Sequence, residues 1–206
     1  MKVIKRNILP FQEDDIFSPI RNKADYAKLL ALSAQILLLE NYFQKGTTSS
    51  LKLIIDKMNR LFFYTKDKYF SISFPFSVIL DKHKLITSIN TYSGKELDFK
   101  SISAILAILQ SDQYNINPSL IDFSLEPGSI DTDGLFILEE IFQFEPAYVR
   151  YDHDPIHQNG KLHPLHHLDI NYSTYGTFKL GLNDMITESY FENIHNINTD
   201  CNFVID

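Results

Sequence analysis

The chain has 206 residues, a formal net charge of −7 and a single cysteine, Cys201. This length usually forms one domain with a substantial core, and a lone cysteine excludes a disulfide framework and any zinc site built from several thiolates. The negative net charge argues against a protein that binds long nucleic acid through a broad basic surface. With seven glycines and no GxGxxG or GxxxxGK[ST] string, the sequence also lacks the common phosphate-binding loops.

The first ten residues, MKVIKRNILP, lack the long apolar run and cleavage site of a signal peptide. The longest apolar stretches elsewhere fall short of the roughly 20 residues that a membrane-spanning helix needs. We therefore expect a cytoplasmic protein that makes no membrane contact.

Residues 23–44 predict the first long helix, because helix-forming residues dominate and apolar ones recur at helical spacing. Asn22 can cap its start and Gly46 can end it. The helix is apolar on more than one side around Leu37–Leu39. We expect it to be deeply buried, or packed against a partner protein or a second copy of the chain.

A second helix is predicted from Ser49 or Ser50 to about Arg60. Its apolar side would carry Leu53, Ile54, Met58 and Leu61. Together the two helices would make residues 16–60 a helical N-terminal part, followed by a sheet-rich remainder.

From residue 61 onward, aromatic and β-branched residues predict strands at 61–65, 69–76 and 85–92, with a turn at 81–84. Helical spacing returns at 98–111 and at 131–142. Three further strands, 147–152, 165–171 and 175–180, precede a last helix at 187–195. This order predicts a single α+β domain with an antiparallel sheet and with N-terminal and flanking helices.

The segment from Tyr148 to Asp169 concentrates the chemistry of the chain. Five of the seven histidines lie between His153 and His167, and histidine both transfers protons near neutral pH and binds metals. Arginine and aspartate are interleaved with them. We expect any active site to be built here.

Strand alternation sorts this segment into two faces. The polar faces carry Tyr148, Arg150 and Asp152 on the first strand and His167 and Asp169 on the second. The opposite faces, Val149/Tyr151 and Leu168/Ile170, would turn to the core. If the two strands pair as a hairpin with a long loop, the polar side chains meet.

The remaining histidines take other places in this scheme. His163, beside Pro164, is expected to overhang the polar face, and His166 to point toward the core. His153 and His157 belong to the connecting loop and, with Tyr148, are secondary candidates.

One chemistry that fits is metal-independent cleavage of a phosphodiester. His163 and His167 would act as general acid and base, and Arg150 would bind the phosphate. Asp152 or Asp169 would orient an imidazole.

A second chemistry places one divalent metal ion on His163, His167 and either Asp169 or Asp152, with a position open for water. A third interpretation is structural only: an arginine–aspartate pair ties the two strands together, and the histidines around it are surface residues.

At these residues the chain resembles an uncharacterised bacterial family, domain of unknown function 2290. Its members carry an Arg-Tyr-Asp strand followed by a His-Pro…His-x-His strand. Here the matching residues are Arg150, Tyr151, Asp152, His163, Pro164 and His167, with Asp169 standing in place of the last histidine. The pattern is also similar to that of small toxins from toxin–antitoxin pairs. The resemblance implies a bacterial protein from a mobile or anti-phage locus.

We therefore expect a phosphodiester-acting enzyme, a nuclease or toxin-like effector, with RNA or single-stranded nucleic acid as its substrate. One alternative is a non-enzymatic subunit of a defence complex, which would dock through the 23–44 helix or the aromatic surface around Phe62–Phe76. Another alternative is a metalloenzyme that acts on small molecules.

Overall fold

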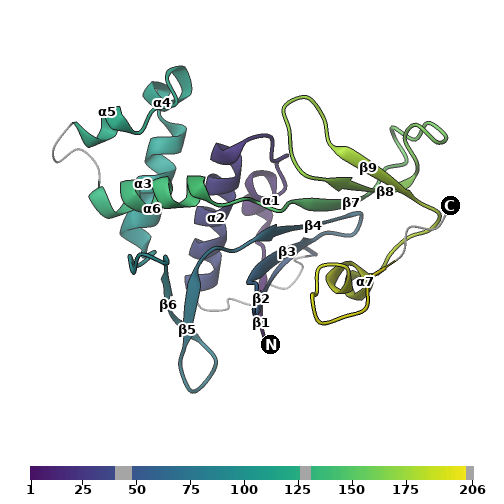
Figure 1. Cartoon of the computed structure of the whole chain (residues 1–206), viewed down its shortest axis with the longest axis horizontal. Helices are drawn as coiled ribbons and strands as arrows, with labels where there is room; N and C mark the ends of the chain where they lie inside the picture. The colour runs from purple at the N-terminus through teal and green to yellow at the C-terminus, as the bar shows by residue number, and fades with distance from the viewer. Residues whose placement is uncertain (40–47, 126–130, 203–206) are drawn as a thin grey trace.

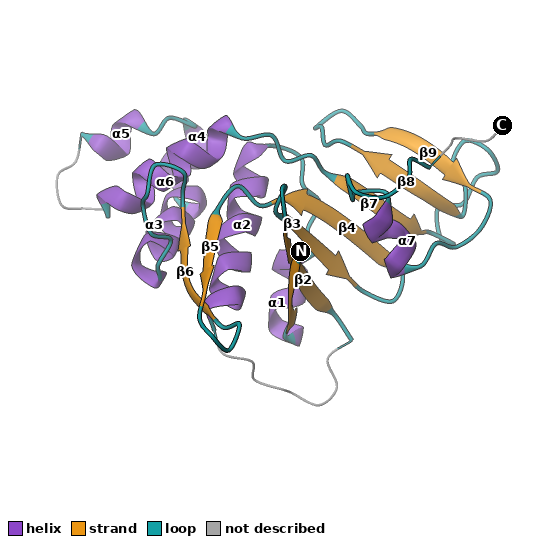
Figure 2. Ribbon diagram, turned by 60° about the horizontal axis from the view of Figure 1, so that its bottom comes forward, coloured by secondary structure: helices purple, strands orange, loops and turns teal. Residues whose placement is uncertain are grey.

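The computed structural model describes residues 1–39, 48–125 and 131–202. Its centre is a seven-stranded sheet in the order β1-β2-β3-β4-β7-β8-β9, in which all neighbours are antiparallel (Figures 1 and 2). The strands are β1 (Lys2–Asn7), β2 (Ser50–Ile55), β3 (Arg60–Tyr64), β4 (Lys68–Ser73), β7 (Val149–His153), β8 (His166–Ile170) and β9 (Phe178–Leu182). A separate hairpin pairs β5 (Ser77–Leu80) with β6 (Ile86–Asn90).

Most of the helices lie on one face of this sheet, and the last one lies on the other. They are α1 (Pro10–Ile16), α2 (Lys23–Leu38), α3 (Phe99–Gln110), α4 (Asp112–Ile116), α5 (Ile121–Ser124), α6 (Thr132–Gln143) and α7 (Glu188–Asn193). The predicted α+β class with an antiparallel sheet is confirmed.

The larger of two hydrophobic cores lies between the sheet and the main helical layer. Side chains such as Leu53, Phe63 and Ile72 point from β2, β3 and β4 toward α2, which contacts α3 and α6. Burial of so much apolar surface is the main source of stability in a fold of this kind. Figure 2 shows that β8 and β9 extend beyond these helices.

The smaller core lies on the opposite face, beneath α7. Residues of β3, β7 and β8, among them Phe62, Tyr64, Tyr151 and Leu168, pack there around Phe191, which is fully buried. Both faces of the central strands are therefore covered. This explains why consecutive residues of β3 and β4 are buried, rather than every second one.

Several predicted elements are confirmed, and their ends are fixed by capping side chains. Asn22 accepts a hydrogen bond from the Asp25 backbone N–H, and Asp98, Asp131 and Thr187 do the same for α3, α6 and α7. The predicted strands at 61–65, 69–76 and 85–92 correspond to β3, β4 and β6. Residues 40–44 of the first predicted helix, and Gly46, lie outside the described residues.

The helix predicted from Ser49 or Ser50 to Arg60 is wrong. Residues Ser50–Ile55 form β2, and Arg60 begins β3. The apolar residues there fit the spacing of a helix and also that of a strand, because Leu51 and Leu53 are two residues apart and share one face of a strand. Pairing of β2 with β1 on one side and β3 on the other decides for the strand. The N-terminal part is consequently mixed rather than helical.

The sequence did not predict five of the elements: the strands β1 and β5 and the helices α1, α4 and α5. All are short, and none carries a long periodic pattern. Strand β1 exists because it completes the ladder of β2, with Ile4 opposite Leu53. The turn predicted at 81–84 does connect β5 to β6.

The two surfaces proposed for docking belong to the interior of this chain. Along α2, nine of the described side chains are buried, and the aromatic residues from Phe62 to Phe76 lie in the two cores. Their apolar character is thus explained without a partner. Within the described residues, no helix combines the length and the hydropathy that crossing a bilayer requires.

His195, just after α7, should make the fold sensitive to acid. Burial, aided by the positive charge of Arg60, lowers its pKa to about 4. The unfolded chain therefore binds this proton near pH 6.5 and the folded chain only near pH 4. Stability is full above pH 6.5, and we expect about 2–3 kcal/mol to be lost as the pH falls from 6.5 to 4.

Urea unfolding at pH 7 and at pH 4.5 measures this loss. Other groups titrate in the same window, so the comparison is with His195→Gln, which cannot take up the proton. The variant should lose about 2 kcal/mol less than the native chain between the two pH values. Equal losses in both proteins would show that His195 does not control the acid response.

Candidate functional site

The pairing of β7 with β8 brings the polar residues of the two strands together. Arg150 lies opposite Asp169, and Asp152 lies opposite His167. Because directly opposed residues of an antiparallel pair share a face, all four side chains project to the same side of the sheet. The hairpin pairing predicted from strand alternation is confirmed.

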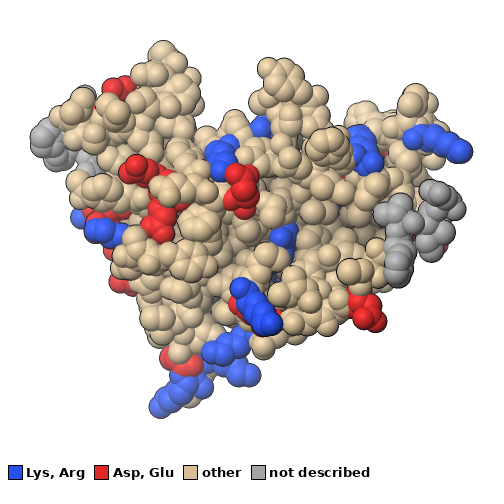
Figure 3. Space-filling view, viewed as in Figure 1, with Lys and Arg blue, Asp and Glu red and all other residues tan. Residues whose placement is uncertain are grey.

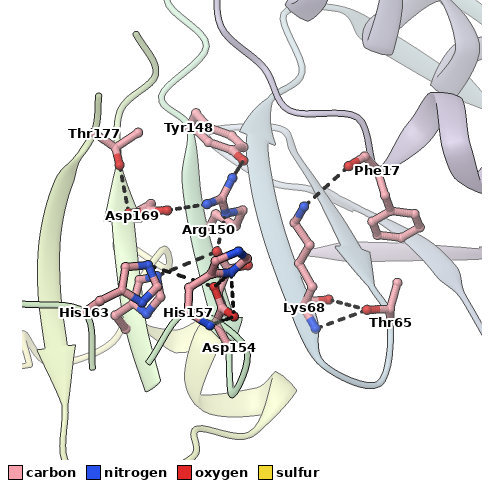
Figure 4. Close-up of polar contacts among 12 residues, drawn as sticks. Phe17, Thr65, Lys68, Tyr148, Arg150, Asp154, His157, His163, Asp169 and Thr177 are labelled. Carbon is pink, nitrogen blue, oxygen red and sulfur yellow. Dashed lines mark hydrogen bonds and ion pairs between the residues drawn. The ribbon is translucent and has the colours of Figure 1, made fainter. Parts of the chain in front are cut away.

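Arg150 is the centre of this group (Figure 4). Its Nε donates to Asp152 Oδ2 at 2.7 Å, and its Nη2 donates to Asp169 Oδ2. Tyr148 completes the surroundings with a long 3.5 Å contact from Nη1. Burial opposes the charge on Arg150, but Tyr148 and the two carboxylates outweigh it and raise its pKa. The guanidinium is therefore held as a permanent cation between two anions.

Asp169 is the most deeply placed carboxylate of the site, with an exposed fraction of 2%. Its second oxygen, Oδ1, accepts a 2.8 Å hydrogen bond from the Thr177 hydroxyl. Arg150 lies on β7 and Thr177 lies just before β9, so the carboxylate of Asp169 on β8 is held from both neighbouring strands. Such a complete set of partners is what allows a charged group to be buried.

His167 is also buried, with an exposed fraction of 1%. Its Nδ1 lies 3.0 Å from the Pro164 carbonyl oxygen. A carbonyl can only accept, so Nδ1 carries a proton and Nε2 is the nitrogen that faces the rest of the cluster. That atom faces Asp152 Oδ2 at 3.8 Å. The backbone contact thus fixes both the tautomer and the direction of the ring.

His163 overhangs the same face, as predicted. Its ring centroid lies 4.6 Å from that of His167, and its Nε2 lies 3.9 Å from Asp154 Oδ2. The side chain is 23% exposed. Its Nδ1 is buried without a hydrogen-bond partner in the described part of the chain. His163 therefore contacts the buried His167 on one side and reaches solvent on the other.

The other histidines lie apart from this group. His166 and His153 oppose each other on the reverse face of β7 and β8, where their rings stack at 5.0 Å. His166 accepts or donates a 2.8 Å bond with the Tyr151 hydroxyl, in keeping with its predicted inward direction. His153, at the end of β7 rather than in the loop, contacts Asp67 instead.

His157 lies in the predicted connecting loop, where its Nδ1 contacts Asp154 at 3.0 Å. Of the secondary candidates, only Tyr148 touches the central group, and burial raises its pKa to about 12. A neutral phenol next to Arg150 at neutral pH can orient it but cannot serve as a base.

Three residues offer a ligand set for a metal ion. One donor atom each from Asp152, His167 and Asp169 lies within 4.8 Å of the others. The sequence predicted His163, His167 and one aspartate as ligands, whereas the structure brings together His167 and both aspartates. Two carboxylates and one imidazole suit divalent ions such as Mn²⁺ or Zn²⁺. The bonds from Thr177 to Asp169 and from His167 to Pro164 are the outer contacts that orient metal ligands.

Two lysines that the sequence analysis did not place in the site flank it. Lys68 on β4 lies opposite Asp152, and Lys179 on β9 lies opposite Asp169. In the described part of the chain neither forms an ion pair, and Lys68 Nζ makes only a 3.4 Å contact with the Phe17 carbonyl (Figure 4). Burial, aided by the charge of Arg150, lowers the pKa of Lys68. Lys68 comes from a distant part of the chain, so only the pairing of β4 with β7 reveals it as a neighbour of Asp152.

The site lies on the side of the sheet that carries the larger core. Arg150 is opposite Phe70, a member of that core. The expectation that Val149/Tyr151 and Leu168/Ile170 face the main core is therefore corrected: Tyr151 and Leu168 pack in the smaller core under α7. The polar residues occupy the part of the sheet beyond the main helices. Loops 154–165 and 171–177 flank them there instead.

Charged side chains elsewhere do not form one basic surface on the face shown in Figure 3. Acidic and basic residues are interspersed there, and basic ones gather at the tip of the β5–β6 hairpin, which carries Lys82 and Lys84. Comparison with protein-family models, with curated proteins and with solved structures finds no match. The similarity to domain of unknown function 2290 and to toxins thus stays a prediction.

Proposed function

We propose that this protein is a phosphodiester-acting hydrolase that uses one divalent metal ion bound by Asp152, His167 and Asp169. The observation that supports the proposal best is the convergence of these three donor atoms within 4.8 Å beside two lysines. When bound, a divalent ion supplies a Lewis acid for a phosphoryl oxygen and for an attacking water.

The geometry favours this reaction over a metal-independent one. That mechanism needs Arg150 as a phosphate ligand, yet its guanidinium is engaged by Asp152 and Asp169. The charges of these three groups sum to −1 (one cation, two carboxylates), which leaves an anionic site. These three groups therefore attract a cation, and the positive charges left to attract a phosphate are those of the flanking lysines, Lys68 and Lys179.

The two flanking lysines suit an anionic substrate. Lys68 and Lys179 stand on either side of the cluster, and both are without an ion pair among the described residues. Their charges would bind a phosphate next to the metal ligands. Since the chain carries a net charge of −7, we propose a short or single-stranded nucleic acid as substrate rather than long duplex DNA.

His163 is the proton donor or acceptor in this proposal. It is partly exposed, and it lies next to the buried His167. Imidazole changes its charge near neutral pH and can protonate a leaving oxygen. Asp154, near its Nε2, would orient the ring.

Metal binding is the first test. Titration of Mn²⁺, Zn²⁺ and Mg²⁺ into metal-stripped protein should show one site for at least one of these ions. At a free concentration of about 100 times the dissociation constant, the bound ion should raise the free energy of unfolding by about 2.7 kcal/mol. His167→Gln should weaken binding by at least about 10-fold.

His153→Gln is the matched control, because this histidine lies on the reverse face of the same strand pair. It should bind the ion as the native chain does. Stabilisation that is absent for all three ions, or equal in the His167 and His153 variants, would refute the metal site. Chelator-resistant hydrolysis that disappears in His163→Gln would instead support the metal-independent reaction.

A nuclease or toxin-like effector of a bacterial defence or toxin–antitoxin locus would fit this site. That assignment rests on the Arg150-Tyr151-Asp152 and His163-Pro164…His167 pattern and not on the geometry. Cleavage of single-stranded RNA or DNA by the purified chain would support it, whereas hydrolysis of small phosphodiesters alone would favour the small-molecule metalloenzyme.

A further inference from the structure

A buried arginine lies on the opposite face of the sheet from the candidate active site. Arg60 begins β3 and is 5% exposed. In the described part of the chain it pairs with no carboxylate. Its Nε donates to the Ser71 hydroxyl at 2.8 Å and its Nη2 to the Ala147 carbonyl at 2.6 Å. A buried cation held only by neutral groups is costly, and an anion would offset that cost.

Arg60 lines a cavity of about 110 Å³ between the β2–β3 turn, β1 and the residues that follow α7. The third guanidinium nitrogen, Nη1, makes no hydrogen bond to the described residues and is not among their buried atoms without partners. It is therefore the donor left for a molecule in the cavity.

The remaining walls of the cavity are mostly apolar. Val3, Ile54, Met58, Phe62 and Ile197 contribute to them. The cavity shares Met58, Arg60 and His195 with a neighbouring hollow of about 510 Å³. The space beside Arg60 is therefore large enough for a small ring, since an apolar cavity of about 150 Å³ accepts benzene. The ligand should consequently combine a small apolar body with one anionic group.

The other charged and titratable groups in the cavity limit the charge of that ligand. Glu192 is engaged by Lys52 and the Tyr64 hydroxyl, and Asp56 accepts from Asn198. His195 donates its Nδ1–H to the Phe191 carbonyl, so its ring is neutral with Nε2 unprotonated. Arg60 is the buried cation of the cavity. Lys57 and the N-terminal ammonium of Met1 also line it, so three cations face two carboxylates and leave a net charge of +1 (3 − 2). This balance suits a monoanion and disfavours a phosphate dianion.

We infer that the cavity at Arg60 binds a small apolar monocarboxylate, with the carboxylate on Arg60 Nη1 and the apolar part against Met58 and Phe62. The planar guanidinium matches the geometry of a carboxylate. This site is separate from the proposed metal site, because Arg60 and Arg150 project from opposite faces of the sheet.

Calorimetric titration of the full chain with benzoate tests the inference. Benzoate should bind with a dissociation constant below about 1 mM. Benzyl alcohol, which has nearly the same size but no charge, should bind at least about 10-fold more weakly, and so should inorganic phosphate. In proton NMR spectra, benzoate should shift the ring signal of His195 and leave that of the exposed His83 in place.

Two variants locate the site. Arg60→Gln should weaken benzoate binding at least about 10-fold by removing the charge. Met58→Trp fills the mouth of the cavity from a position that is 41% exposed, so it should block binding without disturbing the fold. Met185→Trp makes the same change at another exposed position and is the control.

Any of three results overturns the inference. They are a dissociation constant for benzoate above about 1 mM, equal binding of benzyl alcohol and benzoate, and native benzoate binding by Met58→Trp. If Arg60→Gln does not fold, Met58→Trp and the comparison with benzyl alcohol still decide the question.

Discussion

Replacing Asp152 with asparagine should reduce phosphodiester hydrolysis at least ~100-fold while the chain stays folded. The asparagine side chain would keep a carbonyl oxygen for the Arg150 Nε–H, so the structural contact at 2.7 Å is retained in neutral form. The proposed metal site, however, would lose one of its two carboxylates. Loss of an outer contact costs about 10- to 100-fold, and loss of a ligand should cost more.

The measurement is the hydrolysis of bis(p-nitrophenyl) phosphate and of a single-stranded RNA with the metal ion that binds. Urea unfolding accompanies it and should show a loss of about 1–2 kcal/mol, because the bond to Arg150 loses its charge. Asp67→Asn is the matched control, since Asp67 also contacts a side chain of β7 but on the reverse face. Similar rates for the two variants would place the reaction elsewhere.

Replacing Asp169 with alanine should cost about 3–5 kcal/mol in the free energy of unfolding. Asp169 is 2% exposed and accepts from both Arg150 and Thr177. Its removal leaves a half-buried guanidinium with Asp152 as its remaining charged partner, and a hydroxyl without an acceptor. Breaking a buried pair by deleting one member is costly for this reason.

Urea unfolding in metal-free buffer measures the effect, so that it is independent of the proposed ion. Thr177→Val removes only the neutral hydrogen bond and should cost about 1 kcal/mol. A loss below about 1 kcal/mol for Asp169→Ala would mean that Arg150 relaxes into solvent without it. The pair would then contribute little to the attachment of β8 to β7.

Together the two variants separate function from structure within one cluster. The third interpretation made from the sequence, a strand-linking pair with histidines around it, also predicts the stability loss at Asp169. It does not predict a binding site for metal or the activity loss at Asp152. A stable, inactive Asp152→Asn next to an unstable Asp169→Ala is the result that only a catalytic site explains.

Local patterns in the sequence were enough to predict which side chains of β7 and β8 share a face. Arg150 and Asp152 are two apart, as are His167 and Asp169, and residues of a strand at this spacing always share a face. Helix starts were predictable as well, because a cap such as Asn22 or Thr187 bonds within its own turn.

The failures lie where one pattern allows two structures. Ser50–Ile55 has apolar residues that satisfy a helix and a strand equally, and a serine that could cap a helix. Its neighbours β1 and β3 decided the outcome by supplying hydrogen-bond partners on both sides. The same holds for the direction of Tyr151 and Leu168, which face a second core that exists only because α7 folds back over the sheet.

The sequence by itself therefore determined which residues share a face, where several helices begin and which segment concentrates histidine and aspartate, since these properties depend on neighbours a few residues apart. The tertiary structure decided that both aspartates engage Arg150, that Lys68 joins the site from a distant part of the chain, and that Arg60 lies in a cavity. These facts depend on the order and register of the strands, which no local pattern specifies, because pairing is fixed by the total surface that the whole chain can bury.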